Sequence, residues 1–297
     1  MENSIEEWIK NGGSSYKLMR QAVHIILKAI SIDGFLSETM VMKGGTLLGV
    51  RHGSDRYTTD IDFSTENKYQ DFDFEGFIVR FNNALDNAES QLAYGMKSKV
   101  QSYKVQPNAK GTFPTVKMKI AYCEKRNVSH MSRLDKGDAP TVISIDFSFN
   151  EKTYNLDFLN LSEEDGDEDE NIKAYSLIDL LAEKYRSILQ QKVRERNREQ
   201  DIYDVHYLLN KYPGLSKDDK YNVLDCLFKK SEGRGLNDLL NKDGIRDDEI
   251  VRRSKERYND LVSTVKNLPS FESAYDLVAE FYESLPWGVF DVKTDSD

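Results

Sequence analysis

Two aspartates separated by one residue, Asp60 and Asp62, have the types and spacing of a metal-binding pair. Polar and apolar residues alternate through Asp60-Ile61-Asp62-Phe63, which predicts a strand with one buried face. Side chains two apart on a strand share a face, so the carboxylates would stand about 6–7 Å apart. Mg²⁺ is commonly held by one or two carboxylates together with substrate phosphates. The pair therefore predicts a site for a divalent cation.

A glycine turn precedes this strand. Gly44 and Gly45 follow the short apolar run 40–43, which predicts a strand leading into a turn. Glycine lets the backbone approach a phosphate closely. One or two helical turns are predicted over 46–50, and the unpaired N–H groups at their start favour an anion. The Thr46 hydroxyl could donate to the same phosphate.

A third carboxylate, Asp146, lies in the alternating segment 141–149, which also predicts a strand. With it, the chain could hold two metal ions about 4 Å apart, which would activate an attacking hydroxyl and steady a leaving pyrophosphate. Each feature alone has an ordinary explanation: a solvated strand edge, a turn, an exposed strand residue. Their combination in this order is more specific than any one of them.

A second group of polar residues lies in the helical C-terminal part. Ser176 and Asp179 have the capping-box form at the start of a predicted helix that carries Lys184. Lys184 neighbours apolar positions, so it could extend outward to solvent or meet a triphosphate. Asp201 and Asp204 are three apart and share a helix face. Taken alone, they would form ordinary ion pairs.

The ordered combination resembles the DNA polymerase β-type nucleotidyltransferases: a Gly-Gly-Thr turn, a short spacer, Asp-x-Asp and a distal strand Asp. Two longer segments resemble the AbiEii/AbiGii toxin family more narrowly, and together they span 43–209. The first is Lys43-Gly44-Gly45-Thr46 with Arg56-x-Thr58-x-Asp60-Ile-Asp62, and the second is Ala182-Glu183-Lys184 with Asp201-x-x-Asp204. Thr58 stands where members often carry Ser, and Gln200 stands where a basic residue is common.

The resemblance implies an α+β fold, an NTP substrate and Mg²⁺ or Mn²⁺. It implies these roles: Gly44, Gly45 and Thr46, with Lys43, at the nucleotide phosphates; Asp60 and Asp62 on the metals; Asp146 on the second metal or as a base; and Lys184 neutralising phosphate charge from the opposite wall of a cleft. Arg56 and Thr58 would steer phosphates or hold the Asp60–Asp62 strand. Asp201 and Asp204 would orient Lys184, contact base or ribose, or hold Arg198.

The resemblance further implies a toxin paired with a separate antitoxin protein. The expected reaction is transfer of NMP from an NTP to an RNA, with the 3′ end of tRNA as the acceptor that some relatives modify. Alternatives are a protein or small-molecule acceptor, or a nucleotide-binding module without turnover. Six basic residues lie between 184 and 198: Lys184, Arg186, Lys192, Arg194, Arg196 and Arg198. They could guide RNA phosphates, or pair with Glu195 and Glu199 on the helix.

The predicted elements divide the chain in two. Helices are expected over 16–37, ending at Gly34, and over 73–94; strands are expected over 99–105, 115–122 and 141–149. From Ser176 onward the pattern is helical, with further segments at 199–211, 218–229, 246–266 and 271–284. The acidic run within 163–170 predicts a solvated linker. We therefore expect a nucleotidyltransferase-like α+β domain with a short mixed sheet (1–165) and a helical domain (172–297) that closes the cleft.

Composition limits the class of protein. The 297 residues carry a formal net charge of −10, which argues against coating nucleic acid through bulk charge but allows a local basic groove. Two distant cysteines and four scattered histidines predict neither a disulfide scaffold nor a zinc site. No segment approaches the ~20 apolar residues of a membrane helix. The acidic, polar N-terminus is unlike a signal peptide, so a cytoplasmic location is expected.

Overall fold

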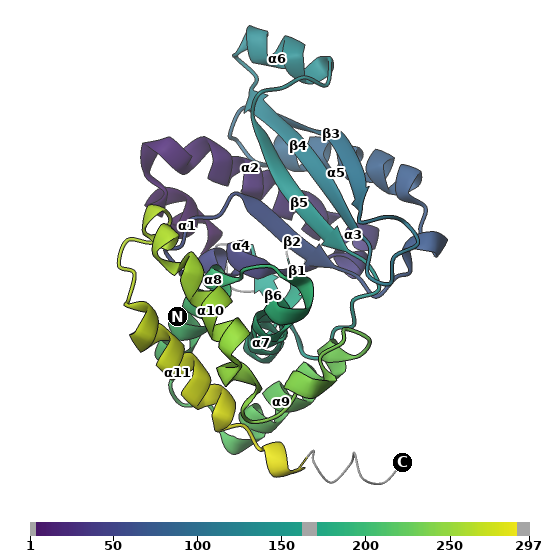
Figure 1. Ribbon diagram of the computed structural model, residues 1–297. Helices are drawn as coiled ribbons and strands as arrows, with labels where there is room; N and C mark the ends of the chain where they lie inside the picture. Colours follow the sequence, from purple (N-terminus) through teal and green to yellow (C-terminus); the bar gives the residue numbers. More distant parts are fainter. Residues whose placement is uncertain (1–3, 162–170, 290–297) are drawn as a thin grey trace. The chain divides into compact units, whose positions relative to one another are not determined.

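The computed structural model describes residues 4–161 and 171–289, and the acidic run predicted to be a linker lies outside them. The chain divides into two compact units. The sheet unit comprises residues 1–54 and 58–175, and the helical unit comprises 55–57 and 176–297. The purple-to-teal and the green-to-yellow parts of the ribbon correspond to them (Figure 1). The predicted α+β class, with a helical C-terminal part, is confirmed.

A seven-stranded mixed sheet forms the centre of the sheet unit, in the order β3-β4-β5-β2-β1-β7-β6. The pairs β2–β5 and β1–β7 are parallel and the other neighbours are antiparallel. The strands are β1 (Val41–Lys43), β2 (Asp60–Ser64), β3 (Met96–Gln106), β4 (Thr115–Glu124), β5 (Val142–Ser148), β6 (Leu156–Asn160) and β7 (Asn171–Tyr175). The predicted strands at 99–105, 115–122 and 141–149 thus correspond to β3, β4 and β5.

Helices cover one face of this sheet, and an aromatic layer fills the space beneath them. Phe63 and Phe147 are fully buried partners on β2 and β5, and Phe77 of α5 stacks on Phe147 with ring centroids 5.6 Å apart. Because side chains alternate along a strand, the neighbours of Phe63 on β2 and of Phe147 on β5 point to the opposite face of the sheet. The helices are α1 (Ile5–Asn11), α2 (Gly13–Ile32), α3 (Gly34–Thr39), α4 (Gly44–Val50), α5 (Phe74–Gln91) and α6 (Val128–Asp135), with a 3₁₀ turn at Tyr69–Asp71.

Two local differences from the predicted elements have clear physical causes. Gly34 begins α3 instead of ending the first long helix, because the Asp33 carboxylate accepts hydrogen bonds from the backbone N–H groups of Phe35 and Leu36. The segment 172–175, which we expected in the helical domain, belongs to β7: Ala174 pairs with Met42 of β1. The division between the units therefore falls at Ser176.

The helical unit packs around α7, which begins where predicted. Ser176 caps α7 by accepting from the backbone N–H of Asp179. The Asp179 carboxylate is fully buried and ion-paired at 2.7 Å with Lys230 of α9. The helices are α7 (Leu177–Arg194), α8 (Glu199–Lys211), α9 (Lys217–Ser231), α10 (Asp248–Glu256) and α11 (Phe271–Glu283), with 3₁₀ turns at Asn237–Leu239, Gly244–Arg246, Tyr258–Ser263 and Trp287–Val289. The predicted helix 246–266 is divided between α10 and the Tyr258–Ser263 turn.

A short piece of the N-terminal sequence completes the helical unit. Residues 55–57, which connect α4 toward β2, belong to it. The Tyr57 N–H donates to the Thr264 carbonyl at 2.8 Å, and the Tyr203 hydroxyl donates to Asp55 at 2.8 Å. The helical unit is thus discontinuous in sequence. Across the described part of the chain, none of the helices combines the length and apolar character needed to cross a membrane.

Candidate active site

A row of four charged residues crosses the sheet face that α5 leaves uncovered. In register, Lys43 of β1 pairs with Asp62 of β2, Asp62 with Asp146 of β5, and Asp146 with Lys117 of β4. Partners in register point to the same face, so two adjacent carboxylates are flanked by an ammonium group on each side. The Lys117 ammonium lies 3.0 Å from the Asp146 carboxylate. The structure therefore brings Asp62 and the distant Asp146 together on neighbouring strands.

Asp60 extends this acidic group along β2. It lies two residues before Asp62 and is the partner of Ser144, so it shares their face. The Thr58 hydroxyl donates a hydrogen bond to the Asp60 carboxylate, and the Thr46 hydroxyl donates to the Asp60 backbone carbonyl at 2.6 Å. The hydroxyls of both threonines therefore hold the start of β2. Because the Thr46 proton is used inside the fold, a phosphate contact by Thr46 would run through its backbone N–H.

Gly44 makes close contact between the glycine turn and Asp62 possible. Its φ is +76°, a left-handed conformation that favours glycine. A Cβ at this position would lie 2.0 Å from Oδ2 of Asp62. The Asp62 carboxylate thus sits directly against the backbone that begins α4. This observation explains physically why a glycine precedes the Asp-x-Asp strand.

The side chains of this face fit a divalent cation in type and in register. Within residues 4–161 and 171–289, however, no three His, Cys, Asp or Glu side chains converge closely enough to hold a metal ion. The Asp146 carboxylate is ion-paired with Lys117, and the Asp60 carboxylate accepts a hydrogen bond from the Thr58 hydroxyl. Neighbouring strands lie about 4.8 Å apart, so the backbones of Asp62 and Asp146 are close enough to share an ion. Rotation of Asp146 away from Lys117 is the change required.

Sequence reasoning missed Lys117. Its signal was the alternation of β4, where buried residues at 116, 118 and 120 place Lys117 and Lys119 on the opposite face. What the alternation could not supply was the strand order, which puts β4 next to β5 and Lys117 beside Asp146. Lys117 is half exposed, so its ammonium is accessible as well as ion-paired.

The second predicted group forms a charge array within the helical unit. Lys184 of α7 donates to Asp201 at 2.6 Å and to Asp204 at 2.7 Å, both on α8. Arg56 forms a two-pronged contact with Asp204, with Nε to Oδ1 at 2.7 Å and Nη2 to Oδ2 at 2.9 Å. Two cations and two carboxylates thus balance one another. Of the three alternatives for Asp201 and Asp204, the structure displays contact with Lys184.

Burial and the neighbouring charges shift the pKa values of this array in opposite directions. Burial alone would lower the pKa of Lys184, but the carboxylates of Asp201 and Asp204 outweigh it and raise the pKa above its usual value. Burial alone would raise the pKa of Asp204, but the charges of Arg56 and Lys184 hold it below its usual value. Both groups are therefore charged at neutral pH. Lys184 is a buried, compensated cation and not an extended surface lysine.

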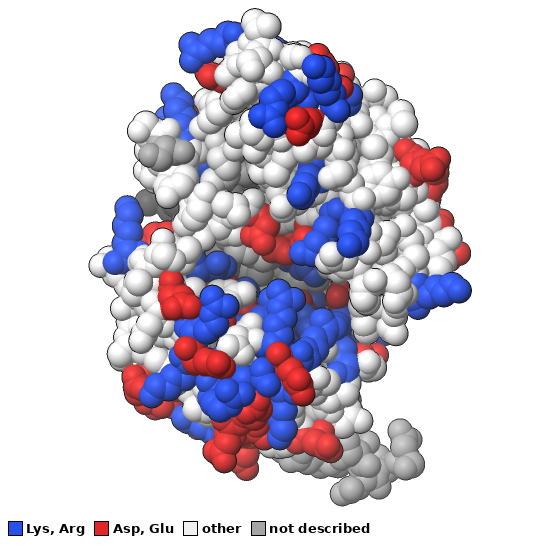
Figure 2. Space-filling view, turned by 45° about the horizontal axis from the view of Figure 1, so that its top comes forward, with Lys and Arg blue, Asp and Glu red and all other residues white. Residues whose placement is uncertain are grey.

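The basic residues between 184 and 198 do not form one continuous stripe. Lys184 is taken up by the array, Arg186 pairs with Glu183 and Gln190, and Lys192 lies 2.6 Å from Asp247. Figure 2 shows Lys and Arg interleaved with Asp and Glu over the lower part of the view. Arg194, Arg196 and Arg198, the other three arginines of the predicted stripe, lie at the end of α7 and in the turn that leads to α8.

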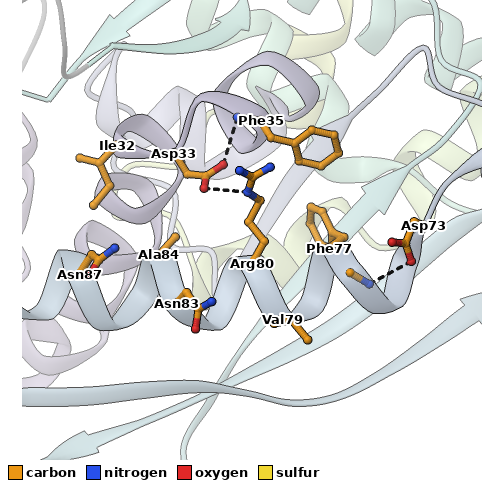
Figure 3. A pocket seen from close by; sticks show the side chains of 11 residues that line it. Ile32, Asp33, Phe35, Asp73, Phe77, Val79, Arg80, Asn83, Ala84 and Asn87 are labelled. Carbon is orange, nitrogen blue, oxygen red and sulfur yellow. Dashed lines mark hydrogen bonds and ion pairs between the residues drawn. The ribbon is translucent and has the colours of Figure 1, made fainter.

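A cavity of the sheet unit lies on the other face, beside α5. It measures about 680 Å³ and lies between α5 and the α2–α3 connection (Figure 3). Arg80 reaches across it to Asp33 at 3.0 Å, and its guanidinium lies 5.3 Å from the Phe35 ring centre. Because α5 packs on the aromatic side of the sheet, this cavity is separate from the carboxylate row. None of the predicted site residues lines it.

The acidic sheet face, with its glycine turn, has the features expected of a nucleotidyltransferase. In agreement, the family model described as "Nucleotidyl transferase AbiEii toxin, Type IV TA system" matches residues 25–277. The chain therefore belongs to the AbiEii family of nucleotidyltransferase toxins of type IV toxin–antitoxin systems. It follows that its substrate is a nucleotide and that a separate antitoxin is its expected partner.

Two solved structures from Helicobacter pylori share the fold. JHP933 is 14% identical, with a TM-score of 0.53 and coverage of 96% of this chain and 99% of that protein. A candidate nucleotidyltransferase of the same organism is 12% identical, with a TM-score of 0.51 and coverage of 94% and 98%. At these identities the likeness establishes the architecture and not the substrate. No curated protein matches the chain in sequence.

Proposed function

We propose that this enzyme transfers NMP from an NTP to an RNA acceptor, with the 3′ end of a tRNA as the specific site, in a reaction that depends on Mg²⁺ or Mn²⁺. The observation that carries the proposal is the register of Asp62 and Asp146, with Asp60 on the same face and the Gly44 backbone against Asp62. An arrangement of this kind gathers negative charge where a cation-bound triphosphate would be held.

We assign metal binding, proton transfer and phosphate binding to different residues of the sheet face. Asp60 and Asp62 would hold the cation that bridges the triphosphate, and Asp146 would bind a second ion or accept the proton of the incoming hydroxyl. When bound, the cation would neutralise charge on the phosphates and on the leaving pyrophosphate. The backbone N–H groups of Gly44 and Gly45 would contact the phosphates. Positioning and charge stabilisation would supply most of the catalysis.

Lys43 and Lys117 would supply positive charge at the two ends of the row. Lys43 is buried, with its ammonium 5.8 Å from the ring centre of Tyr175, so it is held in place. Lys117 is bonded to Asp146 and would be released when Asp146 turns to a cation. Its ammonium would then be available to a phosphate oxygen or the acceptor. We assign both lysines to charge compensation of the nucleotide.

The array in the helical unit supports a second set of assignments. Lys184 would contribute its charge to the phosphates, and Asp201 and Asp204 would orient its ammonium group. Arg56 would act through Asp204, since its guanidinium forms a two-pronged contact with that carboxylate. Thr58 would hold the Asp60–Asp62 strand through its hydrogen bond to Asp60. A location in the cytoplasm, where NTPs and tRNA occur together, belongs to the same proposal.

The test is a transfer assay with each α-labelled NTP in turn, Mg²⁺ or Mn²⁺ and total cellular RNA. We expect label in the tRNA band with one NTP, and its loss in Asp62→Ala. Asp62→Ala should remain folded, because a carboxylate on a polar sheet face adds little stability. Metal-dependent NTP binding without labelled RNA would contradict the RNA acceptor and direct the search to protein or small-molecule acceptors. Transfer that survives in Asp62→Ala would contradict the site.

A further inference from the structure

Three arginines are among the residues that line a small hollow, of about 10 Å³, at the turn between α7 and α8. The hollow is lined by Ser187, Gln190, Gln191, Arg194, Arg196 and Arg198. All six residues belong to the helical unit. Neither Glu195 nor Glu199, the acidic residues of the same turn, is among the lining residues. The residues that line the hollow are therefore three arginines, two glutamines and a serine, with no acidic residue among them.

Two of these arginines differ from the rest of the arginines in the chain. Their side chains form neither an ion pair nor a hydrogen bond within residues 4–161 and 171–289; they are Arg196 and Arg198. Elsewhere in the helical unit, Arg252 pairs with Glu249 and Glu256, and Arg257 pairs with Asp260. In a chain with a net charge of −10, two adjacent uncompensated guanidinium groups indicate a site for an anion from outside the chain.

The turn that carries Arg196 and Arg198 is held by contacts with Gln191 of α7. Gln191 is 1% exposed; its amide oxygen accepts from the Arg198 N–H at 2.7 Å and its amide nitrogen donates to Ser254 at 2.8 Å. Glu195 ends α7 in a left-handed conformation, with φ +50°, and its N–H bonds back to the Gln191 carbonyl. Gln191 thus contacts both ends of the turn, through its backbone carbonyl at Glu195 and through its side chain at Arg198. The backbone that carries Arg196 and Arg198 is therefore held in a defined turn, while the Arg196 side chain itself is exposed.

We propose that this hollow binds a phosphate group of the RNA acceptor's backbone, an inference that rests on the RNA acceptor proposed above. Planar guanidinium groups bind phosphate oxygens in a two-pronged geometry, and several on one surface suit a phosphodiester chain. A free NTP offers the same phosphate chemistry, so the two sources must be separated by experiment. The hollow gives the chain a local basic site without bulk positive charge.

The experiment measures binding of a fluorescein-labelled, mixed-sequence single-stranded RNA, and separately of a labelled NTP, to the full chain. The test variant is Arg196→Gln/Arg198→Gln. The matched control is Arg252→Gln/Arg257→Gln, which removes the same charge from paired arginines of the same unit. We expect the test variant to weaken RNA binding about tenfold and to reduce the slope of log affinity against log salt by about 1.4. The control should change RNA binding less than about twofold.

A charge-conserving variant, Arg196→Lys/Arg198→Lys, should retain most of the salt-dependent binding, which a purely structural role would not explain. Unchanged RNA binding in the glutamine variant, or an equal loss in the control, would overturn the proposal. Loss of NTP binding without loss of RNA binding would overturn it in favour of the nucleotide. RNA binding through the hollow without any transfer would refute only the proposed function; transfer that needs neither arginine would refute only the hollow.

Discussion

At Gly44, the Asp62 carboxylate occupies the space that a side chain at position 44 would need. We expect Gly44→Ala to displace Asp62, because its Cβ would lie 2.0 Å from Oδ2. The left-handed conformation adds about 1–2 kcal/mol of strain. NMP transfer and cation binding should therefore fall sharply, and stability should fall by roughly that strain. Urea unfolding, Mn²⁺ titration and the transfer assay measure the three effects.

A matched control separates strain from displacement of the carboxylate. Gly95 has φ +65°, and a Cβ there would have no atom within 4 Å. Gly95→Ala should therefore lose similar stability while retaining cation binding and transfer. If Gly44→Ala kept normal cation binding, the close approach of the turn to Asp62 would have no functional role. If both variants lost activity equally, general destabilisation would be the explanation.

Lys117 competes with any cation for the Asp146 carboxylate, to which it is bonded at 3.0 Å. We expect Lys117→Ala to strengthen Mn²⁺ binding about two- to fivefold, since a half-exposed ion pair contributes roughly 0.4–1 kcal/mol. Lys119→Ala is the control: Lys119 lies two residues further along β4, opposite Ser144 instead of an acid. Weaker or unchanged Mn²⁺ binding in Lys117→Ala would argue against Asp146 as a metal ligand.

At the scale of elements, local patterns predicted the central strands and most helices well. Alternation located β2, β4 and β5, and 3.6-residue spacing located α5 and α8. Strand β7 was missed because its partner strand β6 and its place beside β1 depend on pairing distant in sequence. The Asp62–Asp146 register likewise depends on strand order, so the sequence could suggest the carboxylates but not their adjacency. For the same reason, the sequence could not place Lys117 beside Asp146.

The α7–α8 charge array should make the helical unit sensitive to acid. The pKa of Asp204 is lowered from 3.8, so its contribution is complete above about 4 and is lost as pH falls through the lowered pKa. The pKa of Lys184 is raised from 10.5, so its contribution persists until strongly alkaline pH. Asp204→Asn should cost about 3–5 kcal/mol at neutral pH, because it leaves Arg56 and Lys184 under-compensated.

The cost of Asp204→Asn should shrink as the pH falls from about 4 through the lowered pKa of Asp204, below which the wild-type carboxyl group is also neutral in the folded protein. Urea unfolding of both proteins at neutral and acidic pH, monitored on the helical unit, gives this difference. Glu272→Gln serves as the control, since that carboxylate pairs with Lys255 at an exposed site and its loss should change stability far less than Asp204→Asn. A constant difference between Asp204→Asn and wild type at every pH would contradict the electrostatic origin.

At the scale of the whole molecule, the chain leaves the sheet unit after Ser54, enters the helical unit for three residues, and returns at Thr58. Sequence patterns gave no sign of this, since 51–56 reads as a charged loop between the glycine turn and β2. The contacts of Asp55, Arg56 and Tyr57 with α8 and with Thr264 are made only in the folded chain. The chain therefore passes between the units three times: on entering 55–57, on leaving that segment, and at Ser176.

Because Arg56 belongs to the helical unit, Arg56→Met should destabilise that unit. Arg56 precedes Asp60 by four residues in sequence, but its guanidinium is bound to Asp204 of α8. Removing one partner of a buried ion pair costs about 3–5 kcal/mol. We expect amide hydrogen exchange to accelerate in α7 and α8 while β4 and β5 keep their protection. Faster exchange confined to β2 and β5 would instead mean that 55–57 serves the sheet unit, and the discontinuous helical unit would be wrong.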